Sequence, residues 1–378
     1  MSERKLRAWQ AAGVIDADTA QRIRAWEADN GRPLVLWAVI GIAVLSIALG
    51  LISVVAANWD DIPVLVRLGA HFALLAAAAF ALWYLAHDAD RPWREEALLF
   101  VFGALGLTFF GHLGQAYQTT SPLWQPLSAW LVLFGPLVLL RGQGAPTARA
   151  LMGVLVVAVW NYAVWSRSGP MEVLRFALPT ALPLVFAPLG AVLRYSSRRT
   201  WFWQRLEELG FAYGLGGASL LAIIAGFERF SRGGDSPQML QAILLWALAG
   251  LVAAAVTWRA RPDPSGRAAA TVLAGSAVIL LLTWPLSGNQ VIGALLFMAL
   301  WALVGWMALK GQWRGVFQLA VAVLALRLIV LSFELDDDLL TSGFGLIGAG
   351  LLILAIAWGA RWVARTYAPA KAMPEDAP

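Results

Sequence analysis

Twelve long apolar stretches run along this chain, and the loops between them are alternately rich and poor in Lys and Arg. A stretch of about 20 apolar residues crosses the hydrocarbon core as a helix, because backbone groups in lipid must be hydrogen-bonded within the segment. Most of the 28 Lys and Arg residues lie in the two tails and in alternate loops. Since basic residues are retained in the cytoplasm, we predict an all-α, polytopic transmembrane helical bundle of about twelve spans with both termini cytoplasmic.

Composition agrees with a membrane setting and narrows the chemistry. Only 13% of the residues are charged, against about a quarter in soluble domains. The basic residues are spread singly rather than gathered on one face, so we expect membrane lipid and no nucleic acid as a partner. Cys is absent, the three His are scattered, and the common catalytic motifs are missing. We therefore predict no metal and no cofactor, and we favour a protein that is not an enzyme.

The chain divides into three predicted parts: a cytosolic helical hairpin over 1–33, a transmembrane helical domain over 34–362 and a disordered cytosolic tail over 363–378. In the hairpin, Gly13 ends the first arm and Asp16 is placed to cap the second. The hairpin mixes basic and acidic side chains, so we expect no signal peptide.

Hydropathy gives the span boundaries. The predicted spans are 34–57, 64–86, 97–118, 124–140, 147–165, 172–193, 208–227, 237–258, 267–284, 288–309, 315–333 and 339–362. Arg141-Gly-Gln follows the fourth span and Lys310-Gly-Gln follows the tenth, which is compatible with two parallel repeats of six spans. Three matched residues do not decide between a duplicated and an unduplicated bundle.

Three arginines, Arg67, Arg175 and Arg327, lie inside apolar stretches, all in the half of the bilayer predicted to be outer. Arg67 and Arg175 are close enough to the boundary to extend their charges to the interface. Arg327 is deeper and shares a helix face with Glu334, seven residues on. Either the two form a buried structural pair, or Arg327 accepts an anion at the base of an outward-facing cavity.

A polar stripe follows one face of the third span through Thr108, His112, Gln115 and Thr119. Such a stripe is unfavourable against lipid, so it should face the bundle interior. Interhelical hydrogen bonding explains it, and the alternative is a binding cavity or proton path through His112. Asn161 in the fifth span is a candidate member of the same network.

Prolines within the sixth span and acidic turns in the outer loops are two further features of the sequence. The sixth span holds Pro179, Pro183 and Pro188, which predict a kinked or discontinuous helix that either packs or borders a binding site. The outer loops carry acidic turns that read as solvated caps or partner contacts rather than as a cation site. These acidic turns contain Asn58, Asp60 and Asp61 after the first span, and Asp336, Asp337 and Asp338 after the eleventh.

Several motifs together resemble a known family. They are Leu6-x-x-Trp9 with Gly13-Val-Ile-Asp, the turn Asn58-Trp-Asp-Asp-Ile-Pro63, the segment Phe110-Gly-His-Leu-Gly-Gln115-x-Tyr117, and Leu123-Trp124. Over roughly residues 1–140 the chain resembles the bacterial DUF2157 family of predicted membrane proteins; Arg327 and the Gly-rich last span also fit. The resemblance implies a bacterial inner-membrane location. It also implies a protein partner facing the periplasm, of the GDYXXLXY type, and it implies no defined activity.

The leading hypothesis is a carrier or ligand-binding membrane protein whose outward-facing cavity takes an anionic or lipid-linked ligand. Arg327, His112, Gln115 and Arg67 would line that cavity. The alternative is a membrane scaffold or sensor that engages a protein partner, and a third hypothesis is an outer-face enzyme acting on a lipid-linked substrate. The first hypothesis requires the third and eleventh spans to meet.

Overall fold

The computed structural model describes residues 9–30, 62–85, 92–118, 120–165, 172–197, 199–227, 236–335 and 343–367, with Leu6 and isolated positions between 39 and 46. The chain divides into two compact units, Met1–Arg67 and Leu68–Pro378. The first predicted span, 34–57, lies largely outside the described residues, as do the tail beyond 367 and both acidic turns.

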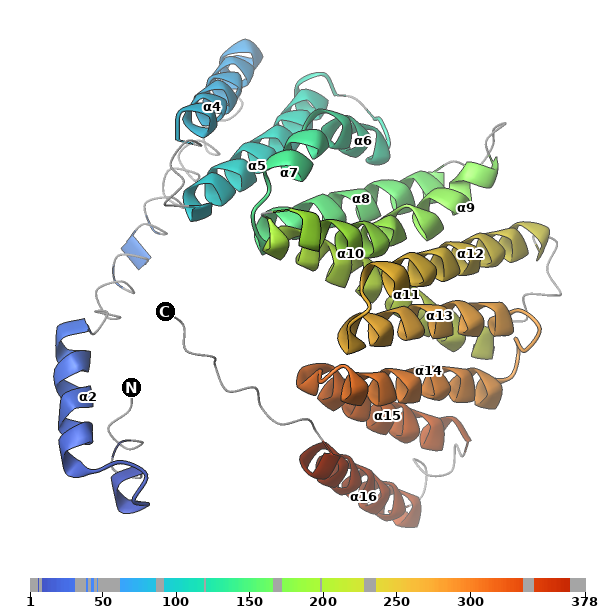
Figure 1. The fold of residues 1–378 in the computed structure, drawn as a ribbon. Coiled ribbons are helices and arrows are strands. Elements are labelled where there is room, and N and C mark those ends of the chain that lie inside the picture. The colour runs from blue at the N-terminus through green and yellow to red at the C-terminus, as the bar shows by residue number, and fades with distance from the viewer. Residues whose placement is uncertain are drawn as a thin grey trace. The chain divides into compact units, whose positions relative to one another are not determined.

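In the first unit, helix α2 (Ala17–Asn30) begins after a tight turn (Figure 1). Gly13 adopts a left-handed conformation with φ 68°, which glycine reaches without strain. Asp16 accepts a hydrogen bond from the backbone N–H of Thr19 at 2.7 Å. The hydrogen bonds from Thr19 hold the pKa of Asp16 below its usual value. Gly13 and Asp16 therefore act as the helix-stop and cap residues that the sequence indicates.

Most of the remaining described residues lie in helices, which short connections join. The helices are α4 (Val64–Leu85), α5 (Pro92–Ala116), α6 (Trp124–Leu133), α7 (Gly135–Arg141), α8 (Ala145–Trp165), α9 (Glu172–Ala181), the 3-10 turn η1 (Pro183–Val185), α10 (Phe186–Ser196), α11 (Thr200–Phe227), α12 (Ser236–Ala260), α13 (Pro264–Thr283), α14 (Gln290–Lys310), α15 (Arg314–Leu335) and α16 (Gly343–Tyr367). They give ten candidate membrane spans, or up to eleven if α6 and α7, bent by 43°, form one. The predicted all-α membrane fold is confirmed.

One span boundary differs clearly from the prediction. Hydropathy starts the seventh span at residue 208, whereas α11 begins at Thr200. Polar residues continue this helix because they pair along it: Gln204 and Arg205 both reach Glu208 one turn on. Hydropathy alone cannot detect such an extension. The sequence prediction therefore assigned Glu207 to a loop, whereas Glu207 lies in α11.

The second unit is a layered stack of helices in which α11 is central (Figure 1). Helix α11 packs against α8, α10, α13 and α14, while α12 packs against α9, α10 and α13. At one side of this core α5 packs on α6, α7 and α8; at the other α15 packs on α14 and α16. One cluster of buried apolar side chains surrounds Leu99, Trp130 and Phe202, and a larger one surrounds Ile243 and Leu273.

The proline-rich sixth span is interrupted where η1 separates α9 from α10. Pro183 has no N–H, so the carbonyl of Pro179 loses its helical donor. The hydroxyl of Tyr213 on α11 donates to that carbonyl instead, and the indole of Trp160 on α8 donates to the Tyr213 oxygen at 2.9 Å. Protein groups therefore satisfy the freed carbonyl, which favours a packing role for this break.

Candidate functional site

Arg327 and Glu334 form a closed pair on α15. The two Nη atoms of Arg327 donate to the two carboxylate oxygens of Glu334 at 2.9 Å each, and Arg327 is only 8% exposed. A bidentate geometry of this kind uses both oxygens of the acid. The pair matches the structural alternative for Arg327.

His112 contacts a second histidine that sequence reasoning did not single out. Its Nδ1 lies 2.8 Å from Nδ1 of buried His71 on α4, and Nε2 of His71 lies 2.9 Å from the carbonyl oxygen of Leu105. Thr108 donates to carbonyls of its own helix, at Ala104 and Leu105, and lies 3.4 Å from His71. The stripe therefore hydrogen-bonds α5 to α4.

The other sequence candidates lie elsewhere. Asn161 accepts a hydrogen bond at 2.8 Å from the backbone N–H of Trp124, so it holds the start of α6 rather than joining His112. Gln115 is exposed near the end of α5, and Arg67 lies in the first turn of α4. Arg175, expected to reach the interface, donates from Nε to the carbonyl of Ala163 at 2.7 Å.

The structure does not assemble these candidates into one cavity. Among the described helices, α5 carries His112 and packs on α6, α7 and α8, while α15 carries Arg327 and packs on α14 and α16. Helices α8, α11 and α14 separate them in the order of packing. The outward-facing cavity lined by Arg327 and His112 is therefore not formed by the described residues.

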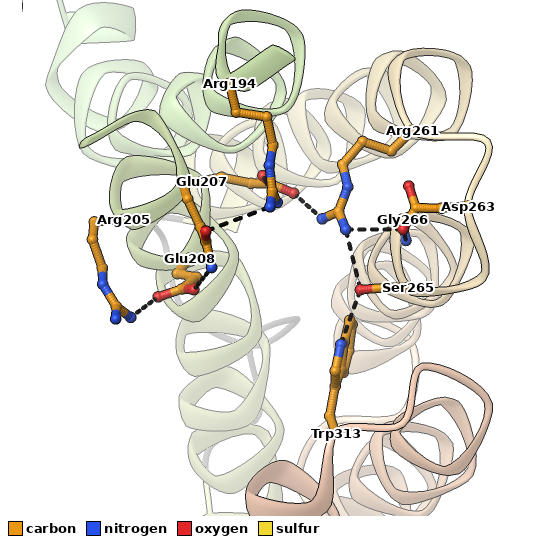
Figure 2. A network of polar contacts seen from close by, with 10 residues as sticks. Arg194, Arg205, Glu207, Glu208, Arg261, Asp263, Ser265, Gly266 and Trp313 are labelled. Carbon is orange, nitrogen blue, oxygen red and sulfur yellow. Dashed lines mark hydrogen bonds and ion pairs between the residues drawn. The ribbon is translucent and has the colours of Figure 1, made fainter. Parts of the chain in front are cut away.

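A different polar cluster lies at the opposite end of the helices. We call the end that carries the connections 142–144, 197–199, 261–263 and 311–313 the basic end; it is the end predicted to face the cytoplasm. There Glu207 of α11 accepts from two guanidinium groups (Figure 2). Arg194 of α10 donates at 3.0 Å, and Arg261, directly after α12, donates to the other carboxylate oxygen.

Local sequence explains why these groups meet. A Cβ atom on Gly190 would lie 2.7 Å from the backbone nitrogen of Glu207, and one on Gly210 would lie 2.4 Å from that of Ala187. Glycine at these two positions thus lets α10 and α11 approach closely, which brings Arg194 beside Glu207. Gly210 is followed at four-residue spacing by Gly214, Ala218 and Ala222, so small residues recur along one face of α11.

The connection from α12 to α13 anchors the other guanidinium. Asp263 caps α13 by accepting from the Gly266 N–H at 3.0 Å, with Pro264 in the first helical position. Arg261 donates to Asp263 and to the Ser265 hydroxyl, each at 3.1 Å. The indole N–H of Trp313 donates to the same hydroxyl at 3.0 Å (Figure 2). The cluster thus joins four parts of the chain: the end of α10, the N-terminal part of α11, the α12–α13 connection with the start of α13, and the α14–α15 connection.

Mutual attraction favours the ionised forms of Arg261 and Asp263 in the α12–α13 connection. Burial alone would lower the pKa of Arg261, but the charges and hydrogen bonds of Glu207 and Asp263 outweigh it and raise that pKa. Burial alone would raise the pKa of Asp263, but the Gly266 N–H and the Arg261 charge hold it below its usual value. Arg261 and Asp263 are therefore both ionised at neutral pH.

A cavity of about 540 Å³ opens beside this cluster, within the size range of small-molecule sites. Its polar end is lined by Arg194, Gln204, Glu207, Glu208, Thr257, Arg261 and Ser265. Its other end is apolar and is lined by Phe211, Leu215, Leu273, Trp301, Val316 and Leu319. We call it the Glu207 pocket. A cavity with one polar end and one apolar end suits an amphiphilic molecule.

Three buried polar atoms on residues that line the Glu207 pocket have no hydrogen-bond partner among the described residues. They are the hydroxyl oxygen of Thr257, which is 1% exposed, Nε of Arg194, and Nε of Arg261, which is 7% exposed as a residue. Buried polar groups in native proteins are almost always paired. Arg327 also has an unpaired Nε but does not line this pocket, so the useful observation is that unpaired atoms and a cavity occur together.

A second polar cluster at the basic end has no such gaps. Glu96 of α5 is buried and accepts from the Gln143 N–H at 2.8 Å, the Thr147 N–H at 3.0 Å and the Thr147 hydroxyl at 2.8 Å. Its neighbour Glu95 pairs with Arg141 at 3.0 Å. We call this the Glu96 cluster. Its hydrogen bonds join the start of α5 to the start of α8, and the dipole of α8 favours a carboxylate at that helix N-terminus.

Sequence reasoning missed both clusters because it treated the basic loops only as a topology signal. One usable signal was present: Asp263-Pro-Ser-Gly266 is a helix-start pattern that places Arg261 at a helix junction. A second was the helical spacing of Glu207 and Phe211, which continues the seventh span toward its N-terminus. No group of His, Asp and Glu suited to a metal ion occurs within the described ranges.

Fold and composition define a multi-pass α-helical membrane protein. A family model described as "Predicted membrane protein (DUF2157)" matches residues 7–147, so the resemblance inferred from the motifs is confirmed over that segment. No curated protein and no solved structure matches the chain. The matched segment contains the Glu96 cluster and ends before the helices that form the Glu207 pocket.

Proposed function

We propose that this chain is a carrier or ligand-binding membrane protein that takes an amphiphilic, anionic or lipid-linked ligand in the Glu207 pocket. The proposal keeps the ligand class inferred from sequence and moves the site from the outward end to the basic end. It includes a bacterial inner-membrane location, with the pocket on the cytoplasmic side.

The observation that carries the proposal is the set of three unpaired buried atoms, Thr257 Oγ1, Arg194 Nε and Arg261 Nε, on residues at the polar end of the cavity. An unpaired buried donor costs roughly 1–3 kcal/mol, and a bound acceptor would recover that cost. Arg261 already donates through both Nη atoms, whereas its Nε–H has no acceptor among the described residues and is a donor that a ligand oxygen would use.

The apolar end supports an amphiphile over a small soluble anion. Leu215 lies eight residues beyond Glu207 on α11, a rise of about 12 Å. Phe211 and Leu319 line the cavity along this length. A hydrocarbon chain extending from a head at Arg261 would be covered by these side chains and would gain about 0.8 kcal/mol for each buried methylene.

Binding of dodecyl sulfonate to the purified full-length chain in lipid nanodiscs tests the proposal. We expect saturable binding that is lost in Ala212→Trp, because Ala212 is exposed on α11 and lines the cavity. Ala255→Trp is the matched control, since Ala255 is exposed on α12 outside the pocket lining. Dodecanol and ethanesulfonate, which lack the charge and the chain respectively, should bind weakly. Equal binding to both tryptophan variants would refute the pocket as the site.

A further inference from the structure

The polar end of the Glu207 pocket is electrically neutral as it stands. Arg194, Arg205 and Arg261 carry three positive charges, and Glu207, Glu208 and Asp263 carry three negative charges (Figure 2). The side chains of Arg194, Glu207 and Arg261 are 16%, 7% and 8% exposed. Water therefore screens these charges poorly, and any change in their sum is unfavourable.

An anionic head placed on these guanidinium groups would leave the site with one uncompensated negative charge. Three routes restore neutrality: release of a carboxylate to solvent, entry of a cation, or protonation of a carboxylate. Glu207 is too buried to reach solvent without unpacking α11 from α10, because Gly190 lies against its backbone. No group of three or more His, Asp and Glu side chains that could hold a metal ion occurs in the described ranges. Protonation is the route that these groups supply.

We propose that the Glu207 pocket takes up one proton with each anionic ligand, and that Glu207 receives this proton as the ligand replaces it on Arg194 and Arg261. The inference rests on the proposed function. In the step, the Glu207 carboxylate and a proton from water form the carboxylic acid, the ligand stays an anion, and no other covalent bond changes.

The charged groups around Glu207 single it out. Arg194 faces it from α10, and Arg261 and Asp263 face it from the α12–α13 connection. Asp263 also accepts from the Gly266 N–H, which the ligand does not replace, so it keeps its charge. On the same helix, Glu208 pairs with Arg205 at the surface, and Arg314 begins α15 on the remaining side. Of the three acids Glu207, Glu208 and Asp263, only Glu207 has guanidinium groups as its sole described partners.

The affinity for dodecyl sulfonate between about pH 5 and about pH 8 tests the inference, because the sulfonate stays ionised and only protein groups titrate. We expect the dissociation constant of the full-length chain to rise about tenfold per pH unit, the slope of one linked proton. Calorimetry in two buffers of different ionisation enthalpy should count about one proton taken up per ligand.

Glu207→Gln keeps the shape and the acceptor oxygen of the side chain, and its affinity should be independent of pH. Glu95→Gln, in the Glu96 cluster outside the pocket, should retain the wild-type slope. Infrared difference spectra of the wild-type chain should show a protonated carboxyl band on ligand binding. Isotope labelling of glutamate carboxyls, and not of aspartate carboxyls, should shift that band.

Each outcome decides between the claims. Sulfonate binding that requires the pocket but shows no pH dependence, or no proton uptake, overturns the proton linkage and leaves the proposed function standing. A band that shifts with labelled aspartate overturns the choice of Glu207. The same conclusion follows if Glu207→Gln folds and keeps the slope. Absence of sulfonate binding at every pH refutes the proposed function and this inference together.

Discussion

Two buried carboxylates at the basic end have opposite surroundings. Glu96 accepts from three neutral donors on one connection: the Gln143 N–H, the Thr147 N–H and the Thr147 hydroxyl. Glu207 accepts from two guanidinium groups on two other segments, and beside it lies a cavity with unpaired donors in its wall. The first arrangement is complete without a ligand, whereas the second has unused hydrogen-bonding capacity.

The difference shows how a structural carboxylate is told from one at a binding site. Both acids are buried, both lie near a helix end, and both join helices that are distant in sequence. Burial and charge alone therefore do not separate them. What separates them is whether neighbouring polar atoms are satisfied and whether space adjoins them. By that criterion Glu96 has a structural role, and Glu207 has the features expected of the proposed binding site.

The largest effect should come from Glu207→Ala. It leaves Arg194 and Arg261 buried beside each other without the carboxylate between them, and removal of one partner of a buried ion pair typically costs about 3–5 kcal/mol. Unfolding of the purified protein in mixed micelles with increasing dodecyl sulfate should show this loss. A smaller loss in Glu207→Gln is the expected control, and equal losses would mean that charge is not what stabilises the cluster.

Glu96→Ala should destabilise the protein somewhat less, by about 2–4 kcal/mol, because it leaves backbone donors at the start of α8 unpaired. Dodecyl sulfonate binding should stay within about twofold of wild type, since a site far outside the pocket is energetically independent of it. Comparable loss of binding in Glu96→Ala and Glu207→Ala would remove the distinction between the two acids.

A pair of Thr→Val substitutions sharpens the comparison at near-constant volume. Thr147→Val removes a hydroxyl that donates to Glu96 and should cost about 1–2 kcal/mol. Thr257→Val removes a buried hydroxyl with no partner among the described residues, so without ligand it should be neutral or stabilising by up to about 1 kcal/mol. The same Thr257 variant should bind dodecyl sulfonate more weakly. Destabilisation by both variants would mean that Thr257 has a partner after all.

The fold was largely predictable because apolar runs and basic loops record the membrane directly. Helices α8, α12 and α14 begin and end within a few residues of the predicted spans. The extension of α11 to Thr200 was not predictable this way, because it depends on side-chain pairing and on burial of Glu207 against α10.

The site was less predictable because it depends on contacts between distant segments. The sequence marks Arg327 as unusual and gives Glu334 as its partner, and the structure contains that pair. The sequence does not indicate that Asn161 would hold the start of α6, or that Arg261 would reach Glu207, 54 residues earlier in the chain. The sequence prediction used loop residues only as a topology signal. A loop residue between packed helices can instead be buried and form an ion pair, as Arg261 does with Glu207.

The smallest expected effect is the pH dependence of the stability that Asp263 contributes. Asp263 shares one property with each of the other two acids: it accepts from backbone N–H at a helix start, as Glu96 does, and it pairs with Arg261, as Glu207 does. Its folded-state pKa is lowered, so the stability it contributes is present above the unfolded value near 3.9 and is lost as pH falls through the folded value. Its side chain is 38% exposed, so the contribution should stay below about 1 kcal/mol.

Asp263→Asn separates the two roles, because Asn caps a helix about as well as Asp but carries no charge. We expect the variant to be slightly less stable than wild type at neutral pH, and the difference to shrink as the pH falls through the lowered pKa of Asp263 and the wild-type carboxyl becomes protonated as well. Thermal unfolding followed from neutral to acidic pH measures both. A constant difference across that range would show that the Arg261 charge contributes nothing at Asp263 and that the cap alone stabilises this connection.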